Sequence, residues 1–352
     1  MAITSKALNK LSTELQEERR SVSFDSYDLS VRQILEMFGS GEITVPPEYQ
    51  RQFVWDTERQ SQLIESIFLG IPVPSLFMAT NPNSTWEVVD GVQRISTIAH
   101  FVGSDNALNR IERDSPLVVK ELEKLDGLNG FTFQDLPRTI QLMFETRPLR
   151  VTVLNDKSDK KVRFDLFERL NTGGVSLTAQ EIRNCVFRGS YNDDIKKLAQ
   201  FDKFNSSVTL KPRDEKNGTR EEFVLRFFAF LNAYTTFDHS VIEFLNDFIE
   251  GNSDDRVPRD QRELFEDTFE VLDGALPAGI HRGSRSLTPV NLYEAMAVGT
   301  ALAIQQVGAA QIKYQKLDAI MRSDDLRKFT AAGTNSRKMV VGRIDHVRDQ
   351  LL

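Results

Sequence analysis

The chain has 352 residues, of which 40% are hydrophobic and 27% charged, so it has enough apolar material for packed cores and is not disordered throughout. This length exceeds the chain length at which a single hydrophobic core usually stops growing, and it therefore predicts two domains. The net charge of -7 is spread along the chain, with no basic half, which argues against constitutive, strong binding to nucleic acid.

Cysteine and histidine are too sparse for ordinary disulfide or metal sites. The single Cys185 cannot form an internal disulfide, and the histidines are too far apart in sequence for a zinc site of ordinary spacing. The start of the chain lacks the apolar stretch of a secretory signal, and no run of about 18 apolar residues predicts a membrane span. We therefore expect a cytoplasmic protein without a membrane partner.

The first segment, residues 1–21, is predicted to be an amphipathic helical arm. Leu8, Leu11 and Leu15 follow helical spacing among charged residues. Such an arm packs either on a partner or on its own domain, and the sequence leaves both uses open.

The next segment begins with a helix and a long loop. Ser30 is predicted to cap a helix that ends at Gly39 and Gly41, and a short strand follows over residues 42–45. Two prolines then prevent that strand from continuing. The sequence PPEYQRQFVW therefore predicts an exposed, extended loop with three aromatic residues.

A helix, two strands and a second helix are predicted after this loop. Asp56 is a good N-cap for a helix that ends at Gly70, and IPVPSLFMAT then feeds a buried strand. The second strand, TWEVV over residues 85–89, runs directly into Asp90-Gly91-Val92-Gln93-Arg94 and the apolar helix ISTIAHFV.

Further elements are predicted up to residue 190. Helices are expected around 117–124 and 135–145, followed by a strand at 149–154 and a helix that ends at Asn171-Thr172-Gly173-Gly174. Thr178 with Glu181 then caps another helix. Beyond residue 190 strand patterns almost vanish, and the amphipathic segments lie at about 192–202, 219–234, 238–249, 259–273, 288–305, 311–322 and 335–351.

The strand-to-helix turn at residues 90–94 carries the strongest chemical pattern. A helix N-terminus presents unpaired N–H groups, Gly91 lets a ligand approach the backbone, and Arg94 can bind phosphate oxygens. Asp90 could bind a divalent ion, and Gln93 could position a water. Spacing alone favours a structural turn, with Asp90 as an N-cap, Gly91 as a turn residue and Arg94 as a surface cation.

Two further groups of residues are candidates on weaker grounds. Tyr49, Gln50 and Arg51 could stack on a base and neutralise a phosphate, although such a loop also fits simple packing. Asn171, before two glycines, could belong to a phosphate-binding nest, although two glycines after a helix are most simply a C-cap.

Four motifs occur in an order that resembles a known family: PPEYQRQFVW, QLIESIFLGIPVPSLFM, WEVVDGVQRISTI and FERLNTGGVSLTAQEIRN. They resemble the DGQQR-motif domains that form the N-terminal part of GmrSD-type type IV restriction enzymes and SspE-like phage-defence proteins. More remotely, they resemble the ParB/sulfiredoxin-like fold. The resemblance implies an α+β ParB/sulfiredoxin-like domain over residues 22–190, and the helical patterns predict an all-α domain over 191–352.

The resemblance also implies a site and a partner. The implied nucleotide-binding and hydrolysing residues are Asp90, Gly91, Gln93 and Arg94, with Tyr49, Gln50 and Arg51 close by. Val92 stands where the family has its first Gln, and the loss of that amide would affect hydrolysis more than binding. Relatives commonly add an HNH-type nuclease with a His-rich metal site, whereas the helical half offers only His239, His281 and His346. We therefore expect the nuclease on a partner.

Together these patterns predict an NTP-binding and NTP-hydrolysing regulatory component of a prokaryotic anti-phage defence, restriction or DNA-processing system. Arg94 would hold phosphates, Asp90 would bind Mg²⁺, Gln93 would position water, and Arg51 would support phosphate or the DNA backbone. The candidate partners are a nucleoside triphosphate, DNA, an effector or nuclease protein, and a second copy of the chain. The alternatives are a non-enzymatic DNA-binding or protein-interaction adaptor and, less favoured, a nuclease that uses the ParB-like core.

Overall fold

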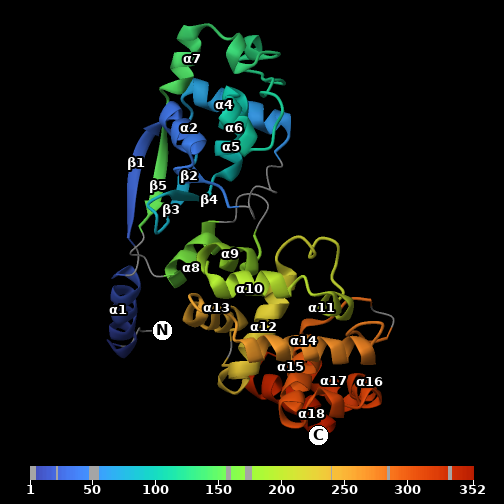
Figure 1. Cartoon of the computed structure of the whole chain (residues 1–352). Helices are drawn as coiled ribbons and strands as arrows, with labels where there is room; N and C mark the ends of the chain where they lie inside the picture. Colours follow the sequence, from blue (N-terminus) through green and yellow to red (C-terminus); the bar gives the residue numbers. More distant parts are fainter. Residues whose placement is uncertain are drawn as a thin grey trace. The chain divides into compact units, whose positions relative to one another are not determined.

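The computed structural model describes residues 5–20, 23–46, 55–155, 160–170, 177–238, 240–283, 286–331 and 335–352. These residues form two compact units, residues 1–176 and residues 177–352 (Figure 1). Each unit is described separately below.

A five-stranded mixed β-sheet forms the basis of the first unit. The strand order is β1-β5-β3-β4-β2, in which β5 pairs parallel to β3 and β2 pairs parallel to β4, while the other pairs are antiparallel. The strands are β1 (Phe24–Ser30), β2 (Ile43–Thr44), β3 (Leu76–Thr80), β4 (Trp86–Asp90) and β5 (Pro148–Leu154).

The helices of the first unit are α1 (Ser5–Arg20), α2 (Val31–Ser40), α4 (Thr57–Leu69), α5 (Val92–Val102), α6 (Asp105–Arg110), α7 (Arg138–Glu145) and α8 (Lys160–Leu170), with short 3-10 helices at Asp126–Leu128 and Phe133–Asp135. Helices α2 and α8 contact the sheet, and α2, α4, α5, α6 and α7 pack against one another (Figure 1). Ser30 and Asp56 cap α2 and α4 through their side chains, as predicted, and Gly41 and Gly70 end these helices in the left-handed conformation.

An aromatic cluster fills the core where α4, α5 and α7 meet. Phe68, Phe101, Phe133 and Phe144 lie with ring centroids 4.9 to 6.2 Å apart, mostly edge to face or tilted. All four rings are buried. The cluster holds α5 against its neighbours and so fixes the position of the turn before it.

Two parts of the first unit differ from the sequence-based expectation. The strand β1 was not predicted, because it is an edge strand whose residues are mostly exposed and show no clean apolar alternation. The helix predicted at 117–124 is wrong. Val119 donates its N–H to the Phe131 carbonyl and accepts from the Gly130 N–H, while Glu121 has a φ of 60°, so this segment is extended and then turns.

The described residues of the second unit form helices and no strand, as predicted. Its helices are α9 (Ala179–Val186), α10 (Ser190–Leu198), α11 (Asp202–Ser207), α12 (Thr219–Ala233), α13 (Val241–Asn252), α14 (Arg259–Ala275), α15 (Val290–Val307), α16 (Tyr314–Arg322), α17 (Asp324–Thr330) and α18 (Arg337–Leu351), with short 3-10 helices at Tyr234–Thr236 and Ala309–Gln311. Helix α15 is apolar and buried along most of its length and packs against α12, α14 and α18. A Cβ at Gly299 would lie 2.6 Å from Val347 Cβ and 2.8 Å from the Ile344 carbonyl, so this glycine permits the close α15–α18 contact.

A buried network of ion pairs joins four helices of this unit. Glu294 on α15 is paired with Arg343 on α18 and with Arg226 on α12, at 2.6 Å for the latter pair. Glu222 connects Arg226 to Arg183 on α9, with N–O distances of 2.7 and 3.3 Å. Burial acts to raise the pKa of Glu222, but the two arginines outweigh burial and hold that pKa below its usual value. The network stabilises the packing of helices rather than presenting charge to solvent.

The two units divide one helix earlier than the predicted ranges 22–190 and 191–352. Helix α9 contacts α12 and belongs to the second unit. Its sequence, however, is part of the motif FERLNTGGVSLTAQEIRN, and for that reason the predicted boundary lies after it. The domain ranges themselves stay predictions. Among the described residues, no helix combines the length and the apolar character that crossing a membrane requires.

Candidate functional site

The strand-to-helix turn at residues 90–94 is formed as the sequence predicts. Strand β4 ends at Asp90, Gly91 makes the turn, and α5 begins at Val92. The β3–β4 register shifts so that Phe77 pairs with Asp90 while Met78 pairs with Val88, which leaves Val89 as an extra residue. Such a bulge redirects the end of a strand and so determines where the Asp90 side chain points.

Glycine is required at position 91 for two reasons. Its φ of 104° lies in the left-handed region, where other residues are strained. A Cβ at this position would also lie 2.5 Å from Leu76 Cδ2. The turn therefore depends on the absence of a side chain.

The first turn of α5 has no capping side chain. Gly91 is the N-cap residue and contributes only its carbonyl, which accepts the N–H of Ile95. The N-terminal amides of a helix carry a partial positive charge and bind anions well. Val92, whose side chain is 6% exposed, is packed in the core and does not offer a polar group there.

Arg94 is held inside the protein rather than extended into solvent. Its Nη2 donates to Asp90 Oδ2 at 2.5 Å, and its Nη1 donates to the carbonyls of Pro74 and Ser75 at 2.8 and 3.2 Å. Arg94 as a whole is 8% exposed. The residue therefore connects the turn to the segment that leads into β3, and a ligand would have to replace one of these acceptors to reach its guanidinium group.

Asp90 is the more accessible partner of this pair. Its side chain is 32% exposed, and Oδ2 is the oxygen that accepts from Arg94. Among the described residues there is no group of three or more His, Cys, Asp or Glu side chains that could hold a metal ion. A single carboxylate nevertheless fits Mg²⁺ that arrives with phosphates, since this ion keeps several waters and uses one or two protein ligands.

Gln93 is the first member of a chain of hydrogen bonds that leads to His100. Its Oε1 accepts the Trp55 N–H at 3.2 Å, and the Trp55 carbonyl accepts from Gln60 Nε2 at 2.7 Å. Gln60 Oε1 in turn bonds His100 Nδ1 at 2.8 Å, while His100 Nε2 lies 3.1 Å from the Ser115 carbonyl. Burial lowers the pKa of His100 below its usual value, although the bond to Ser115 acts to raise it.

Four of the predicted site residues lie outside the described residues: Tyr49, Gln50, Arg51 and Asn171. The structure does place the first described residue after the 47–54 segment, Trp55, against Gln93. On the other side of that segment, Thr44 of β2 pairs with Glu87 of β4. Both flanks of the segment are therefore attached to the strand and helix that make the candidate turn.

Several partners in this site were not predicted. The Pro74 and Ser75 carbonyls and the Trp55 backbone are main-chain groups, so residue type gives no signal for their roles. Gln60 was not predicted as a site residue, yet it is buried and carries two hydrogen bonds. A buried Gln on the apolar side of a helix is the one feature that could have indicated it.

Comparison with known proteins gives one family and one solved structure. Residues 32–188 match the family described as "GmrSD restriction endonuclease, N-terminal domain". No curated protein matches the chain. A solved structure titled "Structure of the C2221 form of Pnob8-like ParB-N domain" is 9% identical and aligns with 92% of this chain and 99% of its own, with a TM-score of 0.22. That score is too low to support a structural argument.

Proposed function

We propose that the chain is a nucleotide-binding regulatory component of a restriction system, because residues 32–188 match the N-terminal domain family of the GmrSD restriction endonuclease. A nucleoside triphosphate would bind with its phosphates at the N-terminal end of α5. This proposal keeps the site that the sequence singles out and assigns its residues more specific tasks.

The observation that carries the proposal is the uncapped N-terminus of α5. Its first amides follow a glycine whose φ is 104°, and no side chain occupies the capping position. This is the arrangement in which backbone N–H groups bind phosphate oxygens. The Asp90 carboxylate lies at the same turn and would bind the Mg²⁺ that accompanies the phosphates.

In this proposal Arg94 fixes the shape of the phosphate site and adds positive charge to it. Its contacts with Asp90 and the Pro74 carbonyl hold β4, α5 and the lead into β3 in one arrangement before any ligand binds. Hydrolysis would need Gln93 to exchange the Trp55 N–H for a water. Tyr49, Gln50, Arg51 and Asn171 keep their proposed roles as nearby phosphate or base contacts.

The remaining parts of the system are proposed to lie on partners. The matched family is named for a restriction endonuclease, so DNA is the proposed target of the system. Since the histidines of the helical half are scattered in sequence, we place the nuclease on a separate effector. Nucleotide binding would then control the engagement of that effector with DNA.

The test measures phosphate release from ATP, GTP, CTP and UTP with Mg²⁺, with and without duplex DNA, beside the nucleotide-dependent rise in melting temperature. Arg94→Ala should abolish both signals. Arg150→Ala is the matched control, because it removes an arginine from the same unit that forms an exposed pair with Asp28. If no nucleotide raises the melting temperature of the wild-type chain and none is hydrolysed, the proposal fails.

A second candidate is a non-enzymatic adaptor that grips a nucleic-acid or protein phosphate at the same turn. The observation that favours it is that Arg94 and the Gln93 oxygen already have protein partners, which suits binding without turnover. Salt separates the two candidates. Binding of DNA by an adaptor should weaken steeply as salt rises, whereas nucleotide binding should depend mainly on Mg²⁺.

A further inference from the structure

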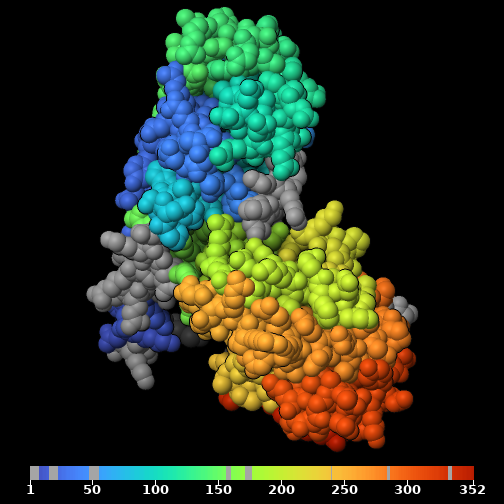
Figure 2. All heavy atoms as spheres, in the orientation of Figure 1, coloured from blue at the N-terminus to red at the C-terminus, as the bar shows by residue number. Residues whose placement is uncertain are grey.

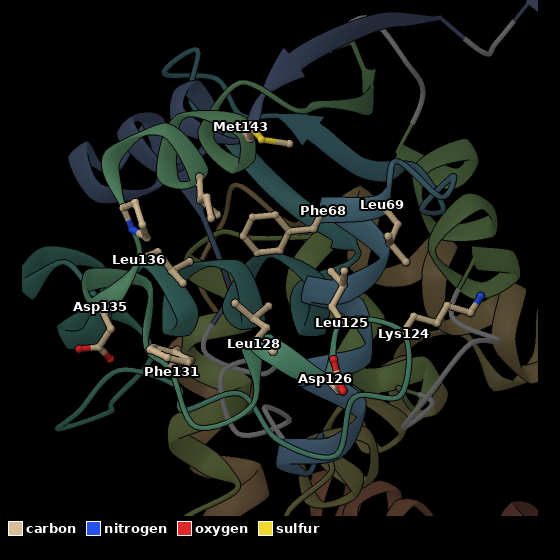
Figure 3. A pocket seen from close by; sticks show the side chains of 13 residues that line it. Phe68, Leu69, Lys124, Leu125, Asp126, Leu128, Phe131, Asp135, Leu136 and Met143 are labelled. Carbon is tan, nitrogen blue, oxygen red and sulfur yellow. The ribbon is translucent and has the colours of Figure 1, made fainter.

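An apolar groove opens on the surface of the first unit. The end of α4, the segment 124–137 and helix α7 enclose a space of about 560 Å³ (Figure 3). Residues of this part of the chain form one end of the unit's surface (Figure 2). Among the apolar side chains that line the groove, Leu69, Phe131, Ile140 and Met143 are each more than a third exposed, and Met143 is 54% exposed. Exposed apolar side chains gathered around a cavity indicate a binding surface.

The amphipathic helix α1 carries an exposed apolar face. Leu8, Leu11 and Leu15 lie at i, i+3 and i+7 and are each about half exposed. An isolated helix of this length is marginal in water, and most helices gain their stability by burying such a face. The groove and α1 are therefore two open apolar surfaces of one chain, one concave and one convex.

Helix and groove also match in charge. Lys10 and Glu14 lie one turn apart on α1 and pair at 3.5 Å. Lys124 and Asp135 lie on opposite sides of the groove opening (Figure 3). A helix whose leucines fill the groove carries Lys10 and Glu14 along one rim of it, and with that rim at Lys124 the Glu14 carboxylate would meet the Lys124 ammonium group.

The length of chain between α1 and β1 favours docking of α1 in the groove of another copy. Phe24 pairs with Leu154 and Ser30 with Pro148, so the N-terminal end of β1 lies about 20 Å from the β5 end that follows α7. From Leu11 to Phe24 the chain can span at most about 28 Å, and only if helix and linker form one straight line. In that line α1 would point at its own groove instead of lying along it.

We propose that α1 of one chain docks in the groove of a second copy, and that two copies exchange their α1 helices about a two-fold axis. Each exchange buries one leucine face and one groove, so the assembly is closed and neither apolar surface remains exposed. This inference does not depend on the proposed nucleotide site.

Disulfide trapping tests the proposal. Leu11→Cys chains are mixed with Met143→Cys chains and exposed to a mild oxidant, and the mixture should give a covalent dimer that neither variant gives alone. The natural Cys185 is buried and does not compete. Ile242→Cys, at a comparably exposed apolar residue of the second unit, replaces Met143→Cys as the control and should give no dimer.

Three outcomes would overturn the proposal. One is a mixture that yields no more product than the Ile242→Cys control, and another is efficient dimer formation by Leu11→Cys alone, which means that α1 pairs with α1. The third is that a double variant, Leu11→Cys with Met143→Cys, forms its disulfide only within one chain and gives no covalent dimer.

Charge reversal tests the orientation of the helix. Glu14→Lys and Lys124→Glu should each raise the dimer dissociation constant about two- to fivefold, measured by sedimentation, as for a partly exposed ion pair. The variant with both changes should return close to the wild-type value. Additive weakening in the double variant would contradict the proposed orientation.

Discussion

The two units use arginine–carboxylate pairs in opposite ways. In the second unit Glu294 and Arg343 are fully buried, and each charge of the network is matched by charges from other helices. In the first unit the pair of Asp90 and Arg94 also ties elements together, but the Asp90 side chain is 32% exposed and lies beside the uncapped start of α5.

The difference separates structural charge from charge that can act on a ligand. A buried network that is fully paired holds helices in register and offers nothing to a solute. The pair of Asp90 and Arg94 gives the same rigidity to a helix N-terminus, the kind of terminus that binds anions, and its carboxylate is partly exposed. The predictions below test this contrast, beginning with the largest expected effect.

Removing Glu294 should cause the largest loss of stability. Glu294→Ala leaves Arg226 and Arg343 buried without a shared carboxylate, which is expected to lower the free energy of unfolding by about 3–5 kcal/mol. Denaturant unfolding of the full chain measures this loss. Asp318→Ala is the control, because Asp318 pairs with Arg322 on the surface and should change stability by less than about 1 kcal/mol. Equal losses of stability in Glu294→Ala and Asp318→Ala would contradict the structural role given to the buried network.

Adding one methyl group at the turn should have the next largest effect. Gly91→Ala combines a φ of 104° with a contact of 2.5 Å to Leu76 Cδ2, so we expect a loss of about 1–3 kcal/mol together with loss of nucleotide binding. Gly251→Ala, within α13, meets no atom within 4 Å and should be neutral or slightly stabilising. Thermal unfolding of both variants checks the sign and the order.

Removing Asp90 should cost less than removing Glu294. After Asp90→Ala, Arg94 still donates to the Pro74 and Ser75 carbonyls, so the expected loss is about 1–2 kcal/mol. Unfolding midpoints measured beside those of Glu294→Ala give the comparison. A loss as large as that of Glu294→Ala would mean that the turn is as structural as the buried network.

The pH dependence from His100 should be the smallest effect. Its pKa is lowered in the folded chain, so the unfolded chain binds the proton first as pH falls below about 6.5. The contribution of His100 to the free energy of unfolding is therefore fully present above that pH. It is lost as the pH falls toward the lowered pKa of the folded chain, and below that pKa it no longer changes. The difference in melting temperature between the wild type and His100→Gln, followed from pH 8 to 5, should show this trend. A difference that does not change with pH would contradict it.

Local signals in the sequence were sufficient for much of the first unit. Ser30, Asp56 and Thr178 were predicted as N-caps, and each accepts the backbone N–H expected of it, because capping depends only on residues within one turn. The turn at Gly91 was predicted for the same reason. The edge strand β1 was missed because its exposed residues carry no pattern that a buried strand would impose.

The contacts of the site could not be predicted from spacing. Arg94 was expected to be free for phosphate, yet it bonds carbonyls about twenty residues earlier in the chain. Gln93 was expected to face water, yet it bonds the backbone of Trp55. Both contacts involve main-chain atoms brought close by the fold, and every residue type supplies such atoms.

Backbone amide NMR of the full chain, titrated with each nucleoside triphosphate and Mg²⁺, tests the central claim most directly. The account predicts that the largest shifts fall on the amides of Gly91, Val92 and Arg94, and that Gly91→Ala abolishes them while Gly251→Ala does not. If these amides stay unchanged at saturating nucleotide, or if the largest shifts fall in the second unit, the N-terminus of α5 is not the phosphate site.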